Sequence, residues 1–298
     1  MSRILITGAS GLVGKRLTQM LSENGHEVLH VGRSKKSGSI KSYVWDIKNG
    51  TIDPKAFDQI DTVIHLAGSG IADERWTKER KRDILESRTK STALLVQKLN
   101  ESNNSVKTLV SASAIGYYGM TLDAKEFTEE SLPGEGFLAD VVTAWEHEAD
   151  QLKNKRLVKI RIGVVFSKDD GALKEIAKPV RFGVGAPLGT GEQYVSWIHL
   201  DDLCGIFIKA VEDESMQGTY NATTGSVTNR ALTKAIAKTL HKPLWLPAVP
   251  GFALKLVLGE MADLVLYGSN VTANKIKQAG FAFKFDTLEK ALNNLLAR

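Results

Sequence analysis

The sequence predicts an α/β protein with a doubly wound parallel sheet, followed by a second, smaller α/β domain at the C-terminus. Two observations predict the sheet. Short apolar runs alternate with longer helical patterns over the first two-thirds of the chain, and each apolar run is continuous. Continuous apolar strands are typical of parallel sheets whose two faces are both covered by helices. The third observation is a cluster of glycines between the first strand and the first helix.

The expected elements follow from these patterns in chain order. A strand at 3–7 leads into a helix at 11–24, which ends at Gly25, a residue type that commonly terminates helices. Further strands are expected at 28–31, 43–45, 62–66, 108–111 and 157–162, with helices at 78–100 and 143–153. A strand, turn and helix are expected over 197–209, and an amphipathic helix over 288–296.

The glycine cluster predicts a dinucleotide-binding loop of the Rossmann type. Glycines 8, 11 and 14 are spaced three apart, directly after a strand and at the start of a helix. The first glycine allows a tight turn, the second lets the backbone approach a pyrophosphate, and the third lets the helix pack on the strand. The helix N-terminus then faces the phosphates. The expected cofactor-binding residues of this loop are Gly8, Ser10, Gly11, Leu12, Val13 and Gly14.

The end of the second strand favours NADP over NAD. NAD-selective sites usually place an acidic residue here for the ribose hydroxyls, but this sequence has Arg33 and Ser34. A guanidinium matches the geometry of a 2′-phosphate. After the third strand, Asp46 is placed to accept from the adenine amino group, although an ordinary surface acid explains it nearly as well. The small turn after the fourth strand is expected under the second ribose and phosphate: Leu66, Ala67 and Gly68.

The pattern changes after Phe166, where glycines at 183, 185, 189 and 191 mark an irregular stretch. We therefore expect an NADP-binding domain over 1–166, to which 195–222 returns. A small substrate-capping domain is expected from 167–194 and 223–298. Trp197 and His199 fall near this junction and are expected as substrate contacts. A histidine suits acid/base chemistry, but a hydrogen-bonded structural role is the alternative.

Composition excludes several other classes of protein. The chain has 298 residues, is 43% hydrophobic and 24% charged, and carries a net charge of +5 without any basic block, so no nucleic-acid partner is expected. The single cysteine, Cys204, suits a reducing cytoplasm. No apolar run approaches the roughly 20 residues that span a bilayer, so no membrane partner is expected. No cluster has metal-ligand spacing, so no metal is expected.

Several motifs together resemble the extended short-chain dehydrogenase/reductase superfamily, in its epimerase/dehydratase branch. More closely, the whole chain resembles the SDR39U1-like epimerase subgroup. The resemblance implies that Arg88 and Gly163 lie near the cofactor, and that a homodimer through the helices at 78–100 and 143–153 is one option. The matching segments are the glycine loop and residues 65–68, 86–88, 111–113, 116–119, 145–146, 161–165, 187–189, 196–202 and 259–261.

The superfamily's catalytic pattern is missing. The resemblance implies a Tyr-x-x-x-Lys motif with a serine or threonine, in which the tyrosine moves a proton while hydride moves to or from the nicotinamide. Alignment on the Trp145–Glu146 pair places Leu138 at the tyrosine and Val142 at the lysine. The expected catalytic candidates are therefore Ser113, Tyr117 and Tyr118, with Glu146 and His147 as alternative proton carriers.

Two functions remain open from the sequence. The first is an NADP-dependent oxidoreductase or epimerase that acts on a small polar substrate, with nucleotide-linked substrates as one class. The second is a catalytically inactive NADP-sensing protein with a regulatory role, for example in cell division. The retained polar residues on the substrate side favour the enzyme.

Overall fold

The structure, a computed structural model, describes residues 1–35, 38–101, 104–168 and 170–297. An eight-stranded sheet forms its centre, in the order β11-β8-β6-β5-β1-β2-β3-β4. Neighbouring strands are parallel except β4, which runs antiparallel to β3. The strands are β1 (Arg3–Thr7), β2 (Glu27–Gly32), β3 (Ser42–Asp46), β4 (Thr51–Ile52), β5 (Thr62–His65), β6 (Thr108–Ala114), β8 (Arg156–Ile162) and β11 (Gly218–Ala222).

The strand order reverses direction beside β1. The chain builds β2, β3 and β4 on one side of β1, then returns to place β5, β6, β8 and β11 on the other side. Ile4 is paired with Val28 of β2 and with Thr62 of β5. Such a reversal leaves a crevice at the carboxyl ends of the two central strands, where open α/β sheets bind their ligands. This confirms the doubly wound sheet that the sequence predicts.

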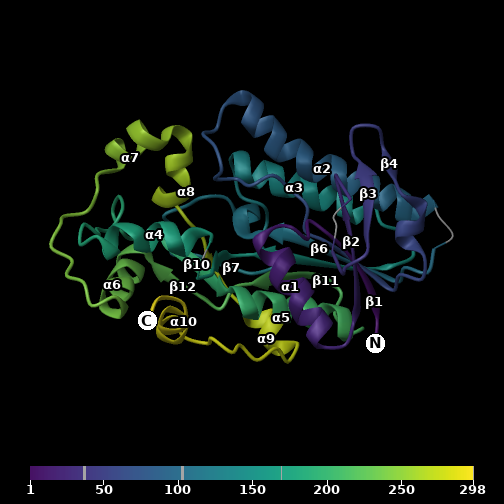
Figure 1. The fold of residues 1–298 in the computed structure, drawn as a ribbon. Coiled ribbons are helices and arrows are strands. Elements are labelled where there is room, and N and C mark those ends of the chain that lie inside the picture. The colour runs from purple at the N-terminus through teal and green to yellow at the C-terminus, as the bar shows by residue number, and fades with distance from the viewer. Residues whose placement is uncertain (36–37, 102–103, 169, 298) are drawn as a thin grey trace.

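Helices cover both faces of the large sheet (Figure 1). On one face, α1 (Leu12–Glu23) packs against α5 (Leu200–Glu212). On the other face, α2 (Lys78–Glu101) packs against α3 (Phe137–Asp150). Short 3-10 helices η1 (Pro54–Phe57) and η2 (Ile115–Tyr118) lie in the connections. The apolar layers between the helices and the sheet form two clusters of buried side chains.

A smaller part of the molecule is built around a three-stranded sheet of β9 (Val164–Phe166), β10 (Tyr194–His199) and β12 (Gly225–Thr228). It has its own apolar core, to which α4 (Ala172–Arg181), α6 (Asn229–Thr239) and α10 (Leu288–Leu296) contribute. The remaining elements are β7 (Glu126–Phe127), α7 (Gly251–Leu258), η3 (Gly259–Ala262), α8 (Asp263–Leu266), β13 (Asn270–Val271) and α9 (Asn274–Gln278).

Residues 195–222, which were expected to return to the NADP-binding domain, contribute to both sheets. Of residues 195–222, β10 lies in the small sheet, whereas α5 and β11 belong to the large one. Helix α9, from the C-terminal segment, likewise lies against β11 of the large sheet.

The expected helix at 143–153 is corrected, because α3 begins at Phe137 and ends at Asp150. Gly136, with φ 99°, turns the chain into the helix. Within the described residues, no helix is both long and apolar enough to cross a bilayer.

Candidate functional site

The glycine loop joins β1 to α1 at the crevice. Gly8 has φ +69°, and a Cβ there would lie 2.7 Å from the backbone of Leu66. A Cβ on Gly14 would lie 2.5 Å from the Gly8 carbonyl oxygen. Gly11 differs, because a Cβ there would meet nothing closer than 3.5 Å. The first and third glycines therefore allow close backbone packing, while the middle one leaves the face of the loop open.

A buried hydroxyl fixes the neighbouring turn. Thr7 Oγ1 accepts hydrogen bonds from Leu66 N–H at 3.1 Å and from Ala67 N–H at 3.3 Å. The same oxygen lies 2.7 Å from His65 Nδ1, and His65 Nε2 lies 2.9 Å from Thr92 Oγ1. Burial lowers the pKa of His65 to about 4, so the ring is neutral. The sequence assigned no role to Thr7 or His65, because their contacts join β1, β5 and α2.

Of the residues predicted to bind the adenosine end of the cofactor, two are exposed and one forms hydrogen bonds within the protein. Arg33 and Ser34 are exposed just beyond β2. Asp46 instead accepts from Asn49 N–H at 3.0 Å and from Asn49 Nδ2 at 2.8 Å. Asn49 holds the pKa of Asp46 below its ordinary value. The turn between β3 and β4 therefore accounts for Asp46 without a ligand.

Arg88 of α2 is a half-buried cation beside the Gly68 turn. A Cβ on Gly68 would lie 3.2 Å from its guanidinium carbon. Its Nη1 donates to the Ile84 carbonyl at 3.0 Å, and the guanidinium lies 5.4 Å from the ring centroid of Trp145. Burial, reinforced by the charge of Arg80, lowers the pKa of Arg88 to about 10. Among the described residues, no carboxylate lies within ion-pair distance of Arg88, and the attraction of the more distant Asp83 is outweighed by burial and by the charge of Arg80.

A network of buried polar side chains lies at the ends of β6 and β8. Ser113 Oγ donates to Glu146 Oε1 at 2.6 Å, and Arg161 forms two hydrogen bonds of 2.8 Å with the same carboxylate. Lys159 Nζ lies 3.4 Å from Glu146 Oε2. Burial pushes the pKa of Glu146 up, but the hydrogen bonds and charge of Arg161 outweigh it and hold the pKa below its ordinary value.

The two tyrosines of η2 have different surroundings. Tyr118 is buried, donates to Asn221 Oδ1 at 2.6 Å and accepts from Arg161 Nη1 at 3.0 Å. Burial raises the pKa of Tyr118. Tyr117 is half-buried, and its ring centroid lies 3.4 Å from the Arg161 guanidinium carbon. Its hydroxyl forms no hydrogen bond with any other side chain or backbone group in the described part of the chain.

Apolar side chains occupy the positions of the superfamily's tyrosine and lysine. Leu138 and Val142 of α3 both point toward Gly116, and a Cβ there would lie 3.4 Å from Leu138 Cβ and 3.6 Å from Val142 Cγ2. His147, on the same helix, is exposed. Glu146 is held as a carboxylate by Arg161, so neither alternative proton carrier gains support from the structure.

The structure does not bring the other expected residues to this network. A Cβ on Gly163 would lie 2.6 Å from the Ser196 carbonyl oxygen, so this glycine allows close strand packing. Trp197 is 2% exposed and stacks on Phe166 in the small core. His199 accepts from Asp201 N–H at 3.0 Å and stacks on Phe285 at 3.7 Å. Trp197 and His199 are therefore part of the interior packing, which gives no support to their expected role as substrate contacts.

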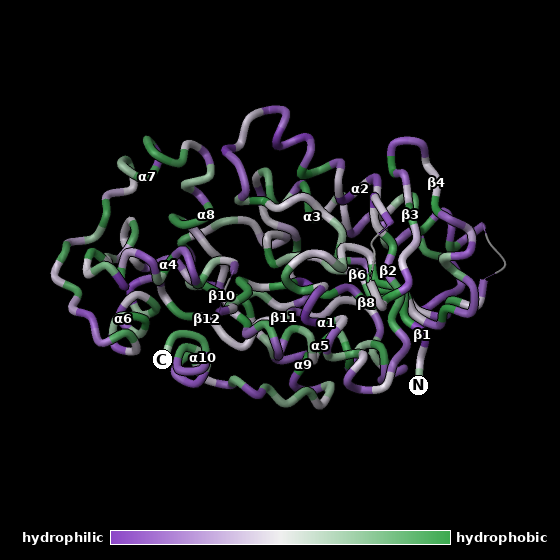
Figure 2. Tube along the Cα trace, viewed as in Figure 1, coloured by the Kyte–Doolittle hydropathy of each residue, from purple (hydrophilic) through white to green (hydrophobic). Residues whose placement is uncertain are grey.

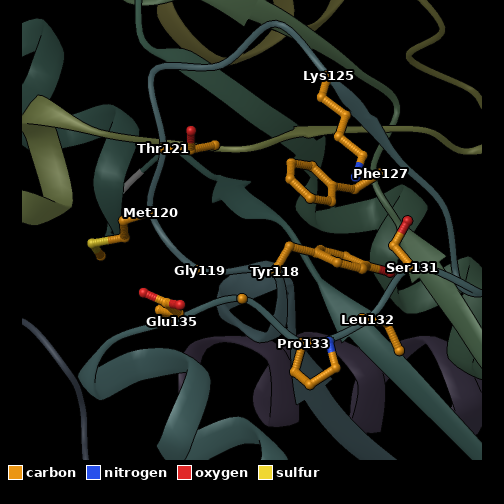
Figure 3. Close-up of a pocket in the computed structure, with 11 residues that line it drawn as sticks. Tyr118, Gly119, Met120, Thr121, Lys125, Phe127, Ser131, Leu132, Pro133 and Glu135 are labelled. Carbon is orange, nitrogen blue, oxygen red and sulfur yellow. The ribbon is translucent and has the colours of Figure 1, made fainter.

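A cavity of about 380 Å³ lies next to the network, in the loop between β6 and α3. Figure 3 shows the Tyr118 and Phe127 rings side by side at its centre; their centroids are 5.3 Å apart. The lining comes from one stretch of chain: Tyr118, Gly119, Met120, Thr121, Lys125, Phe127, Ser131, Leu132, Pro133, Gly134 and Glu135. In the described part of the chain, no group of three or more His, Cys, Asp or Glu residues could hold a metal ion.

The topology and the glycine loop define a Rossmann-type α/β protein with an appended small domain. The NAD dependent epimerase/dehydratase family matches residues 4–223, and a domain of unknown function (DUF1731) matches residues 249–295. The chain therefore belongs to the NAD dependent epimerase/dehydratase family, in a divergent form that lacks the Tyr-x-x-x-Lys motif.

Similar proteins agree with this assignment. The chain is 36% identical to the epimerase family protein YfhF of Bacillus subtilis, covering 99% of this chain and 98% of that protein. It is 37% identical to the chloroplastic SDR39U1 homolog of Arabidopsis thaliana, covering 98% of this chain and 86% of that one. The structure of human SDR39U1 with NADPH superposes with a TM-score of 0.89 at 30% identity, covering 98% of both chains. The UDP-N-acetylglucosamine 4-epimerase of Bacillus cereus shares the fold, with a TM-score of 0.79 at 18% identity over 99% of this chain and 98% of that one.

Proposed function

We propose that the protein is an NADP-dependent oxidoreductase or epimerase that acts on a small polar substrate, with nucleotide-linked substrates as one class. The observation that carries the proposal is the position of Arg88, which lies beside the Gly68 turn without an ion-pair partner among the described residues. A half-buried cation that forms no ion pair within the protein is stabilised by a ligand that brings negative charge. Arg88 lies against Gly68, and the Gly68 turn contacts the glycine loop through Leu66. A dinucleotide phosphate bound at that loop would compensate the charge.

The other residues of the crevice also suit a bound dinucleotide. The open face at Gly11 and the N-terminus of α1, which has no acidic residue in its first turn, suit a pyrophosphate. Exposed Arg33 and Ser34 suit a 2′-phosphate, which favours NADP over NAD. The NADPH in the human SDR39U1 structure supports this choice. Bound there, the cofactor would supply or accept hydride.

The chain's own residues would handle the substrate. Ser113 donates its proton to Glu146, so its oxygen is left to accept from a substrate hydroxyl. Tyr118 is fully engaged, whereas the hydroxyl of Tyr117 is available at the same edge of the sheet. We assign proton transfer to Tyr117 and treat Arg161 as the residue that positions it.

A second candidate function has an observation of its own. Leu138 and Val142 pack where the family's tyrosine and lysine would stand, which suits an NADP-sensing protein without turnover. Such a protein would bind the cofactor tightly, and a protein partner would recognise its cofactor-bound form.

The proposal also includes the cellular compartment in which the protein acts. Cys204 is buried, and burial raises the pKa of its thiol to about 12. A chain with one inert thiol and no disulfide suits the reducing cytoplasm, where we propose that it acts.

The first experiment is calorimetric titration of the purified protein with NADP⁺, NADPH, NAD⁺ and NADH. We expect tighter binding of the phosphorylated forms, and we expect Arg33→Asp to abolish or reverse that preference. Lys48→Asp, an exposed lysine after β3, is the matched control. If none of the four dinucleotides binds, the cofactor proposal fails.

A second experiment separates the enzyme from the sensor. The NADPH-loaded protein is offered a panel of carbonyl substrates and nucleotide sugars while absorbance at the nicotinamide band and product epimers are followed. Turnover that Tyr117→Phe removes, with NADPH affinity unchanged, supports the enzyme. Tight NADPH binding without turnover across the panel favours the sensor.

A further inference from the structure

The small part of the molecule exposes an unusual number of large apolar side chains. Two segments, 176–191 and 231–259, together carry six of the ten large hydrophobic residues that are exposed among the described ones. Trp245 is 67% exposed, Phe252 77% and Leu256 81%. Helix α7 has no buried residue. The six residues are Phe182, Val184, Trp245, Phe252, Leu256 and Val257.

Hydrogen bonds hold these two segments side by side. Trp245 Nε1 donates to the carbonyl oxygen of Gly183 at 2.9 Å. Gly183 stands between the exposed residues Phe182 and Val184 in the sequence. Further on, Gly189 N–H donates to the Val249 carbonyl at 2.9 Å. Helix α4 also packs against α6. In Figure 1 these segments form the end of the molecule opposite the outer strands β3 and β4, and Figure 2 shows the apolar α7 there. We call segments 176–191 and 231–259 the cap tip.

The cap tip is also predominantly basic, although Glu175, Glu192 and Glu260 directly flank its two segments and Glu289 lies 3.6 Å from Lys238. Segments 176–191 and 231–259 contain no aspartate and no glutamate, although the chain as a whole has 34 acidic residues. Arg181 directly precedes Phe182, and Lys242 lies three residues before Trp245. Both cations are exposed. The basic residues of the cap tip are Lys178, Arg181, Lys234, Lys238, Lys242 and Lys255.

We propose that the cap tip docks on an anionic membrane surface. Exposed aromatic and aliphatic side chains lose contact with water when they enter the boundary between headgroups and acyl chains, and tryptophan favours that boundary. The surrounding lysines and arginine would face the negative lipids. A second copy of the chain is a poorer match for this face than an anionic surface, because two faces that both carry an excess of positive charge repel each other.

This proposal modifies the expectation of no membrane partner. That expectation concerned a spanning segment, and within the described residues no helix could span a bilayer. The cap tip would instead rest on one leaflet, anchored by a few side chains and by charge. The docking is independent of the proposed redox chemistry, since none of its residues lies in the glycine loop or in the Ser113 network.

The test uses the full chain and vesicles of two compositions. One is pure phosphatidylcholine, and the other also contains phosphatidylglycerol. We expect the protein to sediment with the anionic vesicles, to be released by added salt, and not to sediment with the neutral ones. Tryptophan emission should shift to the blue on binding, because Trp245 is the one tryptophan among the exposed large hydrophobics of the described residues.

Two variants address the two parts of the face. Trp245→Ser with Phe252→Ser removes apolar anchors, and Lys178→Glu with Arg181→Glu reverses charge. Each should weaken vesicle binding at least about tenfold. The matched controls are Leu132→Ser, exposed on another loop, and Lys48→Glu with Lys153→Glu, which should bind as the parent does. Circular dichroism melting checks that every variant is folded.

Three results would overturn the proposal. One is absence of sedimentation with anionic vesicles, and another is equal loss in the control variants. The third is a dimer, seen by light scattering, that the Trp245 and Phe252 substitutions dissociate while vesicles capture no protein. That last result would assign the face to a second copy of the chain.

Discussion

At the scale of single residues, the least expected finding is that charged groups shielded from solvent have very different partners. Glu146 and Arg161 are 5% and 3% exposed and satisfy each other through two hydrogen bonds. Arg88 is half-buried, and no carboxylate of the described chain lies within ion-pair distance of it. The first arrangement stabilises the free protein, whereas the second prepares it for an anionic ligand.

Replacement of Arg88 should therefore raise stability and lower cofactor affinity. Because burial lowers the pKa of Arg88 well below its ordinary value, to about 10, the charged form costs the folded state up to about 3 kcal/mol. Arg88→Met keeps the packing on Trp145 and should stabilise the protein by about 1–2 kcal/mol. NADPH affinity should fall about tenfold or more. Urea unfolding and calorimetry measure the two effects.

The control for this prediction lies on the same helix. Arg82 is exposed, so Arg82→Met should change neither the unfolding midpoint nor NADPH affinity. If Arg88→Met destabilises the protein to the extent of a lost ion pair, Arg88 is structural and the argument from its missing partner is wrong.

Glu146 should show the opposite behaviour, with a defined pH dependence. Its folded pKa is below its unfolded value near 4.5, so its contribution is present above that value and is lost as pH falls through the folded pKa. Glu146→Gln leaves Arg161 buried without its counter-charge and should cost about 3–5 kcal/mol at neutral pH. The loss should shrink as pH falls through the folded pKa of Glu146, because the parent carboxylate then becomes protonated.

Denaturant unfolding of both proteins between neutral and acidic pH measures this convergence. Glu148→Gln, a half-buried glutamate two residues along the same helix, is the control and should track the parent at every pH. A constant difference between parent and Glu146→Gln across the acidic range would contradict the assigned charge state.

At the scale of elements, the sequence predicted those parts of the site that depend on local pattern. The order of strands and helices, and the position of the glycine loop at the β1–α1 turn, follow from apolar runs and glycine spacing. The start of α3 was missed because the apolar run after Gly136 has no helix-start signal. The Ser113 network was also out of reach, since it joins residues up to 103 positions apart. Contacts of that kind depend on strand order rather than on any local motif.

Two glycines of the loop, Gly14 and Gly11, should respond differently to the same substitution. A Cβ on Gly14 would lie 2.5 Å from a backbone oxygen, so Gly14→Ala must separate α1 from β1 and should cost several kcal/mol. Gly11 has φ −75° and no contact below 3.5 Å, so Gly11→Ala should leave stability within about 1 kcal/mol. The methyl group would nevertheless occupy the open face, and NADPH affinity should fall sharply.

Thermal melting and calorimetry on the two variants separate packing from binding. Gly25→Ala, at the C-terminus of α1 with open space around it, serves as a reference for backbone strain alone. Unchanged NADPH affinity in Gly11→Ala would place the phosphates somewhere other than this loop.

At the scale of the whole molecule, the two parts touch across the crevice through a few exposed contacts. Arg75 donates to the carbonyl oxygens of Leu256 and Val257 at 3.2 and 2.6 Å, near the C-terminus of α7. Lys81 of α2 forms an ion pair with Glu260. Because α7 has no buried residue, these contacts and the segment's own hydrogen bonds hold it in place. Exposed pairs contribute little each, so α7 should open easily.

Removal of both contacts should therefore loosen α7 without unfolding the protein. Arg75→Ala with Lys81→Ala should speed amide exchange about tenfold over residues 251–262, with exchange in β1, β5 and β6 unchanged. Arg82→Ala with Lys90→Ala removes two cations from α2 that do not contact α7, and is the control. Mass spectrometry of hydrogen exchange resolves these segments. If α7 keeps the parent's protection in the double variant, its position is fixed by its own chain connections, and the cap would be expected to move as one body with the small sheet.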